Sequence, residues 1–149
     1  MISEESAGAI VFRKEDGKVF FLLLHYPTSA KSKKEFWDLP KGHMEGDEDE
    51  LSTVRREVEE ETGLKDLDFV EGFRQGIKYY FQFQEKKVFK TVIFLLAETK
   101  TKEITISHEH VGFKWLTFAE ACHQLTYKNA KEILRKANDL INRKFSNGL

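Results

Sequence analysis

The sequence is poor in cysteine, with Cys122 alone among 149 residues. A single cysteine excludes a disulfide within the chain and is typical of a protein from a reducing compartment. The first six residues are partly acidic, and they lack the basic start and apolar stretch of a secretory signal peptide. We therefore expect the protein to be cytoplasmic.

The sequence also lacks a surplus of either charge and any long apolar run. Its 24 lysines and arginines nearly balance 25 aspartates and glutamates, which leaves a net charge of −1. No basic field is present to attract extended nucleic acid. The longest apolar runs, 19–24 and 92–97, are too short to cross a bilayer. We expect a monomer that has neither a membrane nor an extended nucleic acid as its partner.

What the sequence does contain is enough apolar material for one core. Hydrophobic residues make up 40% of the chain, 13 residues are phenylalanine, and 33% are charged. A chain of this length and balance fits a single domain over residues 1–149.

The order of periodic segments predicts an α/β fold. The segments that look extended are 7–12, 19–25, 68–83, 88–97 and 111–115. Asp16-Gly17 lies between the first two and signals a hairpin turn. Thr117 and Glu120 have the spacing of a capping box that opens a short helix, and a last helix is expected from Asn129. This order suits a mixed β-sheet covered by helices on both faces.

The stretch 42–64 is typical of a glycine loop that turns into one acidic helix. Asp47 is the expected N-cap, with Glu50 at capping-box spacing. Gly63 is expected to end the helix in the left-handed conformation. The apolar side of the helix is expected to consist of Leu51, Val54 and Val58.

Beside that apolar side lies an acidic face. Glu57, Glu60 and Glu61 are three and four residues apart, so their carboxylates project together and repel one another. Arg56 is four residues before Glu60 and is placed to orient a carboxylate. Either solvent screens such a face or a hard divalent cation such as Mg²⁺, with Mn²⁺ as a substitute, occupies it. The three glutamates alone favour the solvated helix.

The full spacing favours the cation. The chain has Gly, five residues, Glu, seven residues, Arg-Glu, an apolar residue, any residue, Glu-Glu, any residue, Gly and an apolar residue. Those positions are Gly42, Glu48, Arg56, Glu57, Val58, Glu60, Glu61, Gly63 and Leu64. This pattern resembles the Nudix box of the Nudix hydrolase family, here at 42–64. The resemblance covers nearly the whole chain. It implies the Nudix fold, an α/β/α sandwich, and a metal-dependent pyrophosphohydrolase that acts on nucleoside diphosphates linked to another group.

The residues before the box narrow the resemblance. Trp37, Pro40, Lys41, Gly42 and His43 form Trp-x-x-Pro-Lys-Gly-His, which resembles the asymmetric diadenosine tetraphosphate (Ap4A) hydrolases of the animal and archaeal branch. The resemblance implies hydrolysis of Ap4A to ATP and AMP, with Lys41 and His43 facing phosphate. Without it, both would be ordinary surface residues in a loop.

Further candidates for substrate binding follow the box. The same branch has a tyrosine and a lysine that contact the polyphosphate, and they correspond to Tyr79 and Lys90. This chain has extra residues between the two positions, so Tyr80 is the alternative to Tyr79. An aromatic residue that stacks on the adenine base corresponds to Tyr127. From the residues alone, Lys90 is equally well an outward-facing lysine, and Tyr127 is a packing residue.

A last segment, Ser107-His108-Glu109-His110, resembles the loop that brings an additional glutamate to the metal site. Glu109 is then a metal ligand or the base that activates water, while His108 and His110 pack the loop or support a ligand. The implied metal ligands are Glu57, Glu60, Glu61 and Glu109. The implied catalytic residues are Glu57, Glu60, Glu109 and Arg56, and the choice of general base among the three glutamates stays open.

Two alternatives to Ap4A hydrolysis remain. The first is another Nudix activity, such as pyrophosphate removal from an RNA 5′ end or cleansing of damaged nucleoside triphosphates. The second is a non-catalytic Nudix module that senses nucleotides. The intact set of box glutamates disfavours the second, because an inward-facing acidic set is costly to keep without a cation.

Overall fold

The structure, a computed structural model, describes residues 2–27 and 35–145. Within these ranges, seven strands form one sheet with β3-β2-β1-β6-β5 as its main path, and β4 pairs with β1 and β7 with β2. The strands are β1 (Ile2–Glu15), β2 (Lys18–Tyr26), β3 (Phe36–Asp38), β4 (Lys41–His43), β5 (Asp68–Phe83), β6 (Lys86–Glu98) and β7 (Gly112–Leu116). β1 and β6 run parallel and the other pairs are antiparallel, so the sheet is mixed.

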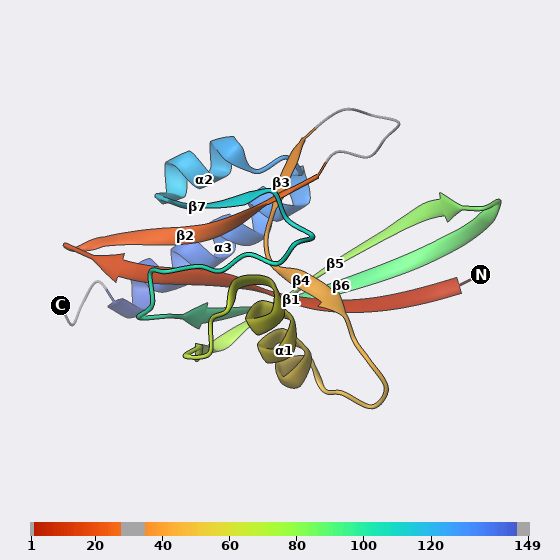
Figure 1. Cartoon of the computed structure of the whole chain (residues 1–149), viewed down its shortest axis with the longest axis horizontal. Helices are drawn as coiled ribbons and strands as arrows, with labels where there is room; N and C mark the ends of the chain where they lie inside the picture. Colours follow the sequence, from red (N-terminus) through yellow and green to blue (C-terminus); the bar gives the residue numbers. More distant parts are fainter. Residues whose placement is uncertain (1, 28–34, 146–149) are drawn as a thin grey trace.

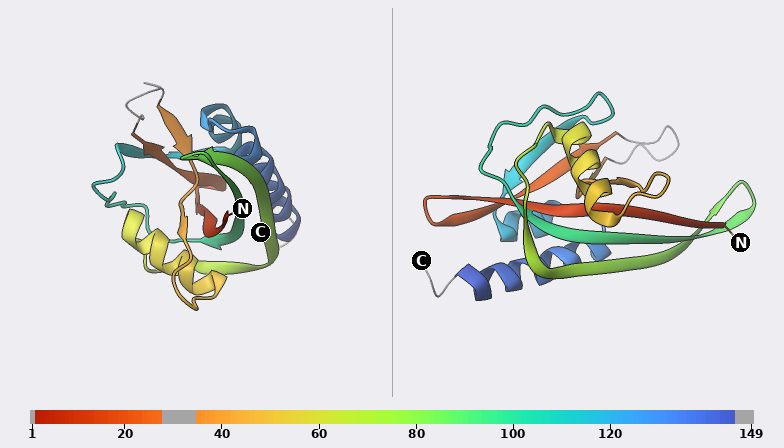
Figure 2. Two further views of the ribbon diagram at one scale, coloured as in Figure 1. Left: turned by 90° about the vertical axis from the view of Figure 1, so that its right-hand side faces the viewer. Right: turned by 90° about the horizontal axis from the view of Figure 1, so that it is seen from below.

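Helices cover both faces of this sheet. The helices are α1 (Glu50–Thr62), α2 (Phe118–Gln124) and α3 (Lys128–Phe145). Figures 1 and 2 show α1 on one side of the sheet and α2 and α3 on the other. The predicted α/β arrangement is therefore confirmed.

Alternation along the central strands divides the core into two parts. On β1, Ile10 and Phe12 pack towards α2 and α3, whereas Ala9 and Val11 pack towards α1. Successive side chains of a strand point to opposite faces of the sheet. The apolar runs in β1 and β2 therefore each contribute side chains to both parts of the core. The core on the α1 side is completed by Val54 and Val58, as expected from the helix pattern.

The sequence pattern misjudged how α1 begins. Asp47 is not the N-cap; the carboxylate of Asp49 caps the helix by accepting a hydrogen bond of 2.7 Å from the backbone N–H of Ser52. The segment before Asp49 is a turn in which the Glu48 carboxylate accepts from the backbone N–H of Glu45, so the helix starts later than predicted. Gly63, at φ 78°, ends the helix as predicted.

The apolar side of α1 also differs at its first turn. Leu51 is 42% exposed, while Thr53 is buried. The hydroxyl of Thr53 donates to the Glu48 carboxylate over 3.0 Å, which satisfies the buried polar group. Thr53 thus takes the buried position that the pattern gave to Leu51.

The remaining turns and caps agree with the sequence. Asp16 and Gly17 have positive φ in the β1–β2 turn, and Thr117 and Glu120 form the expected capping box of α2. α3 begins at Lys128, one residue before its predicted start. No helix in the described ranges is long and apolar enough to span a membrane.

β1 and β6 are longer than the predicted segments 7–12 and 88–97, whereas β5 has the predicted bounds, 68–83. β1 starts at Ile2 because it pairs in parallel with β6 from Ile2, opposite Val88, to Phe12, opposite Glu98. The far end of the β5–β6 hairpin projects from the body beside the start of β1, away from the C-terminal end of α3 (Figures 1 and 2). Residues of β5 and β6 line the cavity that is described in the next section.

Candidate active site

The short strand β4 brings the glycine loop beneath α1. Lys41, Gly42 and His43 pair with Gly8, Ala7 and Ser6 of β1. A Cβ atom added at Gly42 would overlap the carboxylate of Glu57. Glycine therefore lets this carboxylate lie directly against the strand.

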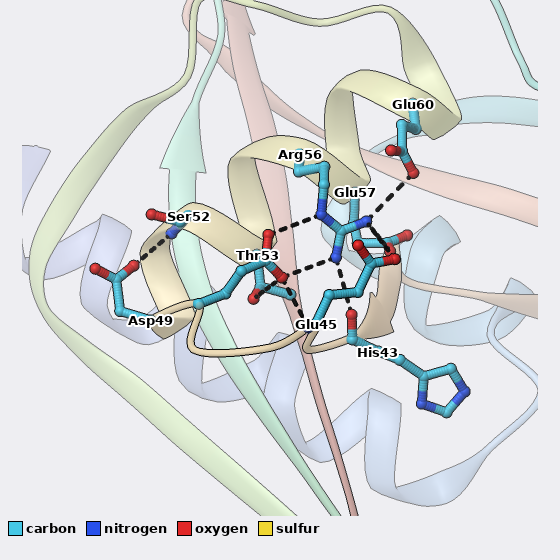
Figure 3. A network of polar contacts seen from close by, with 9 residues as sticks. His43, Glu45, Asp49, Ser52, Thr53, Arg56, Glu57 and Glu60 are labelled. Atoms are coloured by element: carbon cyan, nitrogen blue, oxygen red, sulfur yellow. Dashed lines mark hydrogen bonds and ion pairs between the residues drawn. The ribbon is translucent and has the colours of Figure 1, made fainter.

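Arg56 is the centre of a polar network on α1 (Figure 3). Its guanidinium donates to Glu48 over 2.8 Å, to Glu57 over 2.7 Å, to Glu60 over 3.4 Å and to the backbone carbonyl of His43 over 2.9 Å. The hydrogen bond from Arg56 lowers the pKa of Glu48 to about 2. One cation thus offsets the repulsion among carboxylates that project from one helix face.

Glu61 is held separately and is nearly buried, with 6% exposure. Its Oε2 atom lies 3.4 Å from the Tyr26 hydroxyl. It also lies 3.1 Å from His110 Nε2, at ion-pair distance but without the alignment of a hydrogen bond. The other ring nitrogen of His110 is 2.9 Å from the Ser107 hydroxyl oxygen. Burial raises the pKa of Glu61, and His110 opposes that rise.

We call Glu48, Arg56, Glu57, Glu60 and Glu61 the carboxylate site. Glu57 and Glu61 are one helical turn apart on α1, and the charge of Glu57 contributes to the raised pKa of Glu61. Glu60 points outward, with 59% of its side chain exposed, and Glu109 lies exposed in the turn before β7. Among the described residues, no three acidic, histidine or cysteine side chains are gathered into one ligand cluster.

A second feature is a cavity of about 590 Å³ on the other side of β4. Its lining residues are Tyr26, Phe36, Asp38, Lys41, Ile77, Tyr79, Val92, Phe94, Tyr127, Asn129 and Ala130. Lys41, Tyr79 and Tyr127 were predicted substrate-binding residues, and all three lie in this lining. Pockets of this volume suit a small organic ligand.

Aromatic rings form one wall of the cavity. Tyr26 and Phe36 stack with centroids 4.9 Å apart and an angle of 6°, and Phe36 is 5.8 Å from the half-exposed Tyr127. Tyr79 lines the cavity, whereas its neighbour Tyr80 is 56% exposed and packs on Phe89 instead. Neighbouring residues of a strand face opposite ways, so Tyr79 rather than Tyr80 faces the cavity.

Two lysines stand beside this cavity. Lys41 Nζ lies 3.0 Å from the buried carboxylate of Asp38. Lys90 is paired opposite Tyr79, and partial burial together with the charge of Lys41 lowers its pKa. His43 is exposed outside the cavity, with Nδ1 3.4 Å from the Ser6 hydroxyl oxygen. Its ring points away from Arg56 (Figure 3).

Residues 3–137 match the family model of the NUDIX domain. This chain belongs to the Nudix family. The asymmetrical bis(5′-nucleosyl)-tetraphosphatase of Mus musculus is 34% identical, covering 91% of this chain and 94% of its own. The enzyme of the same name from Sus scrofa is 35% identical with the same coverage. A C. elegans Ap4A hydrolase, solved as a binary complex, superimposes with a TM-score of 0.76 at 26% identity, covering 94% of this chain and 98% of the solved one. The Nudix fold and the predicted resemblance are thereby confirmed.

Nudix hydrolases generally need divalent cations, and the chemistry of this Nudix site fits one. The acidic side chains supply oxygen donors, which hard divalent ions prefer. Gly42 leaves the Glu57 carboxylate at the backbone of β4, and Glu61 is one helical turn further along α1. Two candidate ligands, Glu57 and Glu61, are thus largely buried, while the other two, Glu60 and Glu109, are exposed.

The sequence analysis missed the other eight residues that line the cavity of this Nudix site, and three of them, Tyr26, Phe36 and Asp38, make the aromatic and ionic contacts described above. Phe36 lies opposite Tyr26 in the β2–β3 pair, which no local pattern reveals. Tyr26 did carry a signal, because it continues the alternation of Leu22 and Leu24, whose side chains face α1.

Proposed function

We propose that this Nudix protein hydrolyses Ap4A asymmetrically, giving ATP and AMP, with Mg²⁺ as its cation and Mn²⁺ as a substitute. The observation that carries the proposal is an aromatic cavity for one nucleoside, flanked by Lys41 and Lys90, directly beside the carboxylate site. The names of the relatives from Mus musculus and Sus scrofa support the same reaction.

Each part of the site has a proposed task. Tyr127 and Phe36 provide aromatic surface on which a base stacks. Lys41 and Lys90 bind the negatively charged phosphates. Tyr79 lines the cavity and is paired with Lys90, so it contacts the same phosphate chain. His43, on the open end of β4, is placed to donate to a phosphate oxygen.

The carboxylate side would hold the cation. Glu57 and Glu61 are the proposed core ligands, and Glu60 and Glu109 complete the set by turning towards them. A bound divalent cation supplies charge neutralisation for the polyphosphate and makes a water molecule more acidic. Arg56 keeps Glu57 in place, and one of Glu57, Glu60 and Glu109 accepts the proton from the attacking water.

The remaining proposals concern context. The substrate is a small dinucleoside polyphosphate or nucleotide, and we propose a cytoplasmic monomer. These two properties rest on the composition described above and remain predictions.

Product analysis with Ap4A and Mg²⁺ tests the proposal. The wild type is expected to give ATP plus AMP, and the double variant Glu60→Gln/Glu61→Gln is expected to lose turnover, because two oxygen ligands lose their charge. Glu59→Gln, an exposed position on the same helix, is the matched control and should retain activity.

Other products would identify the alternatives. Two ADP molecules would mean attack at the central anhydride and would refute asymmetric cleavage. Turnover of a triphosphate-ended RNA or a nucleoside triphosphate, with none of Ap4A, would keep the chemistry and reject the substrate. Nucleotide binding without any turnover would favour a sensor.

A further inference from the structure

Tyr26 belongs to both halves of the site. Its ring lines the cavity and stacks on Phe36. Its hydroxyl lies 3.4 Å from Glu61 Oε2 and 3.3 Å from the backbone carbonyl oxygen of Leu39. The end of β2 thus places one side chain against both the cavity and a candidate cation ligand.

The ring of Tyr26 is fixed from two sides. Phe36 lies opposite it in the β2–β3 register and stacks nearly parallel to it. The His110 ring meets it edge-on, with centroids 4.7 Å apart. A ring held in this way has little freedom to move its hydroxyl, so the oxygen stays at the border of the carboxylate site.

Glu61 depends on this neighbour more than the other glutamates do. The Arg56 guanidinium donates to Glu48, Glu57 and Glu60, and no contact joins it to Glu61 in the described part of the chain. The groups at Glu61 are instead the Tyr26 hydroxyl and the His110 ring. A buried carboxylate without such partners would be poorly oriented and destabilised.

The Tyr26 hydroxyl is a donor throughout the physiological pH range. The ordinary pKa of a tyrosine hydroxyl is about 10, so the group keeps its hydrogen at neutral pH. Its single hydrogen has two acceptors, Leu39 and Glu61. The charged acceptor gives the stronger hydrogen bond.

We propose that Tyr26 is a positioning residue whose hydroxyl donates to Glu61 and, with His110, holds this carboxylate in the orientation that binds a divalent cation at the edge of the cavity. The consequence for catalysis rests on the proposed function; the consequence for cation binding does not. Tyr26 therefore acts on the reaction through Glu61, while its ring serves the cavity.

The variant Tyr26→Phe separates these two roles, because it keeps the ring and removes the hydroxyl. Mn²⁺ binding to the protein without substrate, measured by electron paramagnetic resonance, is expected to weaken about 10-fold, the usual effect of removing a group that orients a metal ligand. With Ap4A, kcat should fall while KM stays nearly unchanged, because the stacking surface remains. Tyr80→Phe, which removes an exposed hydroxyl from the opposite face of β5, is the matched control and should match the wild type.

Three results would overturn the proposal. Mn²⁺ affinity equal in Tyr26→Phe and wild type would reduce Tyr26 to a wall of the cavity, as would a rise in KM without a change in kcat or Mn²⁺ affinity. A wild-type protein that binds no Mn²⁺ would also reject it. If the wild type binds Mn²⁺ but does not cleave Ap4A, the proposed substrate fails, and the affinity difference still decides the role of Tyr26.

Discussion

The carboxylate site and the cavity adjoin each other but are built in opposite ways. Every member of the carboxylate site lies between residues 48 and 61, on one helix or just before it. The cavity takes its lining from β2, β3, β4, β5, β6, α3 and the residue before α3. A local site needs one correctly formed helix, whereas a distributed site needs the register of several strand pairs.

Their charges differ as well. The carboxylate site has four glutamates and one arginine, which contacts three of them, so the excess charge is negative. The cavity side has two lysines, Lys41 and Lys90, against two carboxylates, Asp38 and Glu4, so it has cations available and no negative excess. A cation on one side and a polyphosphate on the other would complement both. The two regions should therefore respond differently to substitution. A change in the carboxylate site should lower kcat, whereas a change in the cavity should raise KM.

The largest effect is expected from Gly42→Ala, which breaks the carboxylate site alone. The added methyl group would overlap the Glu57 carboxylate, and a displacement of about 1 Å in a reacting group can lower turnover about 100-fold. Stability should fall little, because the displaced atoms are the end of a flexible side chain. Steady-state kinetics and thermal melting measure the two effects.

Gly112→Ala is the control for this substitution. Its added methyl group would be 4.0 Å from its nearest neighbour, the Cβ of His25. Normal turnover in Gly42→Ala would contradict the assignment of Glu57 to the reaction.

A smaller effect is expected from Tyr127→Leu, which breaks the cavity alone. Loss of the stacking surface should raise KM for Ap4A about 10-fold, since stacking one base on an aromatic ring is worth about 1–3 kcal/mol. The value of kcat should change little, because no residue of the carboxylate site moves. Phe113→Leu, a partly exposed aromatic residue of β7 outside the cavity lining, controls for the loss of a ring. A drop in kcat with unchanged KM would remove Tyr127 from base binding.

The smallest effect is expected from Glu48→Gln, which changes how the stability of the folded protein depends on pH. The Arg56 hydrogen bond holds the pKa of Glu48 at about 2, below the value of about 4.3 in an unfolded chain. Because the folded-state pKa is lowered, this contact stabilises the protein fully above about pH 5, and the stabilisation is lost as pH falls towards about 2. Glu48→Gln should therefore lower the melting temperature at pH 7 by a few degrees and by less at pH 3.

Melting curves between pH 7 and pH 3 measure that difference, with Glu59→Gln as the control on the same helix. A difference between wild type and Glu48→Gln that stays constant over this range would mean that the ionised carboxylate does not supply the stabilisation.

The sequence was informative where the causes of structure are local. The acidic face of α1, the position of Arg56 beside Glu60 and the end of the helix at Gly63 all follow from helical spacing and backbone freedom. Asp47 was expected to cap the helix because Glu50 follows it at capping-box spacing, whereas Asp49 has Ser52 at that spacing. Asp49 is the cap because the Glu48 turn precedes the helix. The error at Leu51 has a similar origin, because Thr53 becomes acceptable in the core only through its contact with Glu48.

By itself, the sequence determined that this protein has the Nudix box, an acidic helix that follows a glycine loop and an α/β arrangement. These features rest on spacing along one chain segment and on the alternation of apolar residues. Only the tertiary structure decided that Tyr26, Phe36 and Asp38 meet Lys41 and Tyr79 around one cavity. The physical reason is that strand pairing, such as the parallel pairing of β1 with β6, brings together residues that are far apart in the chain. No short sequence pattern encodes the register of those pairs.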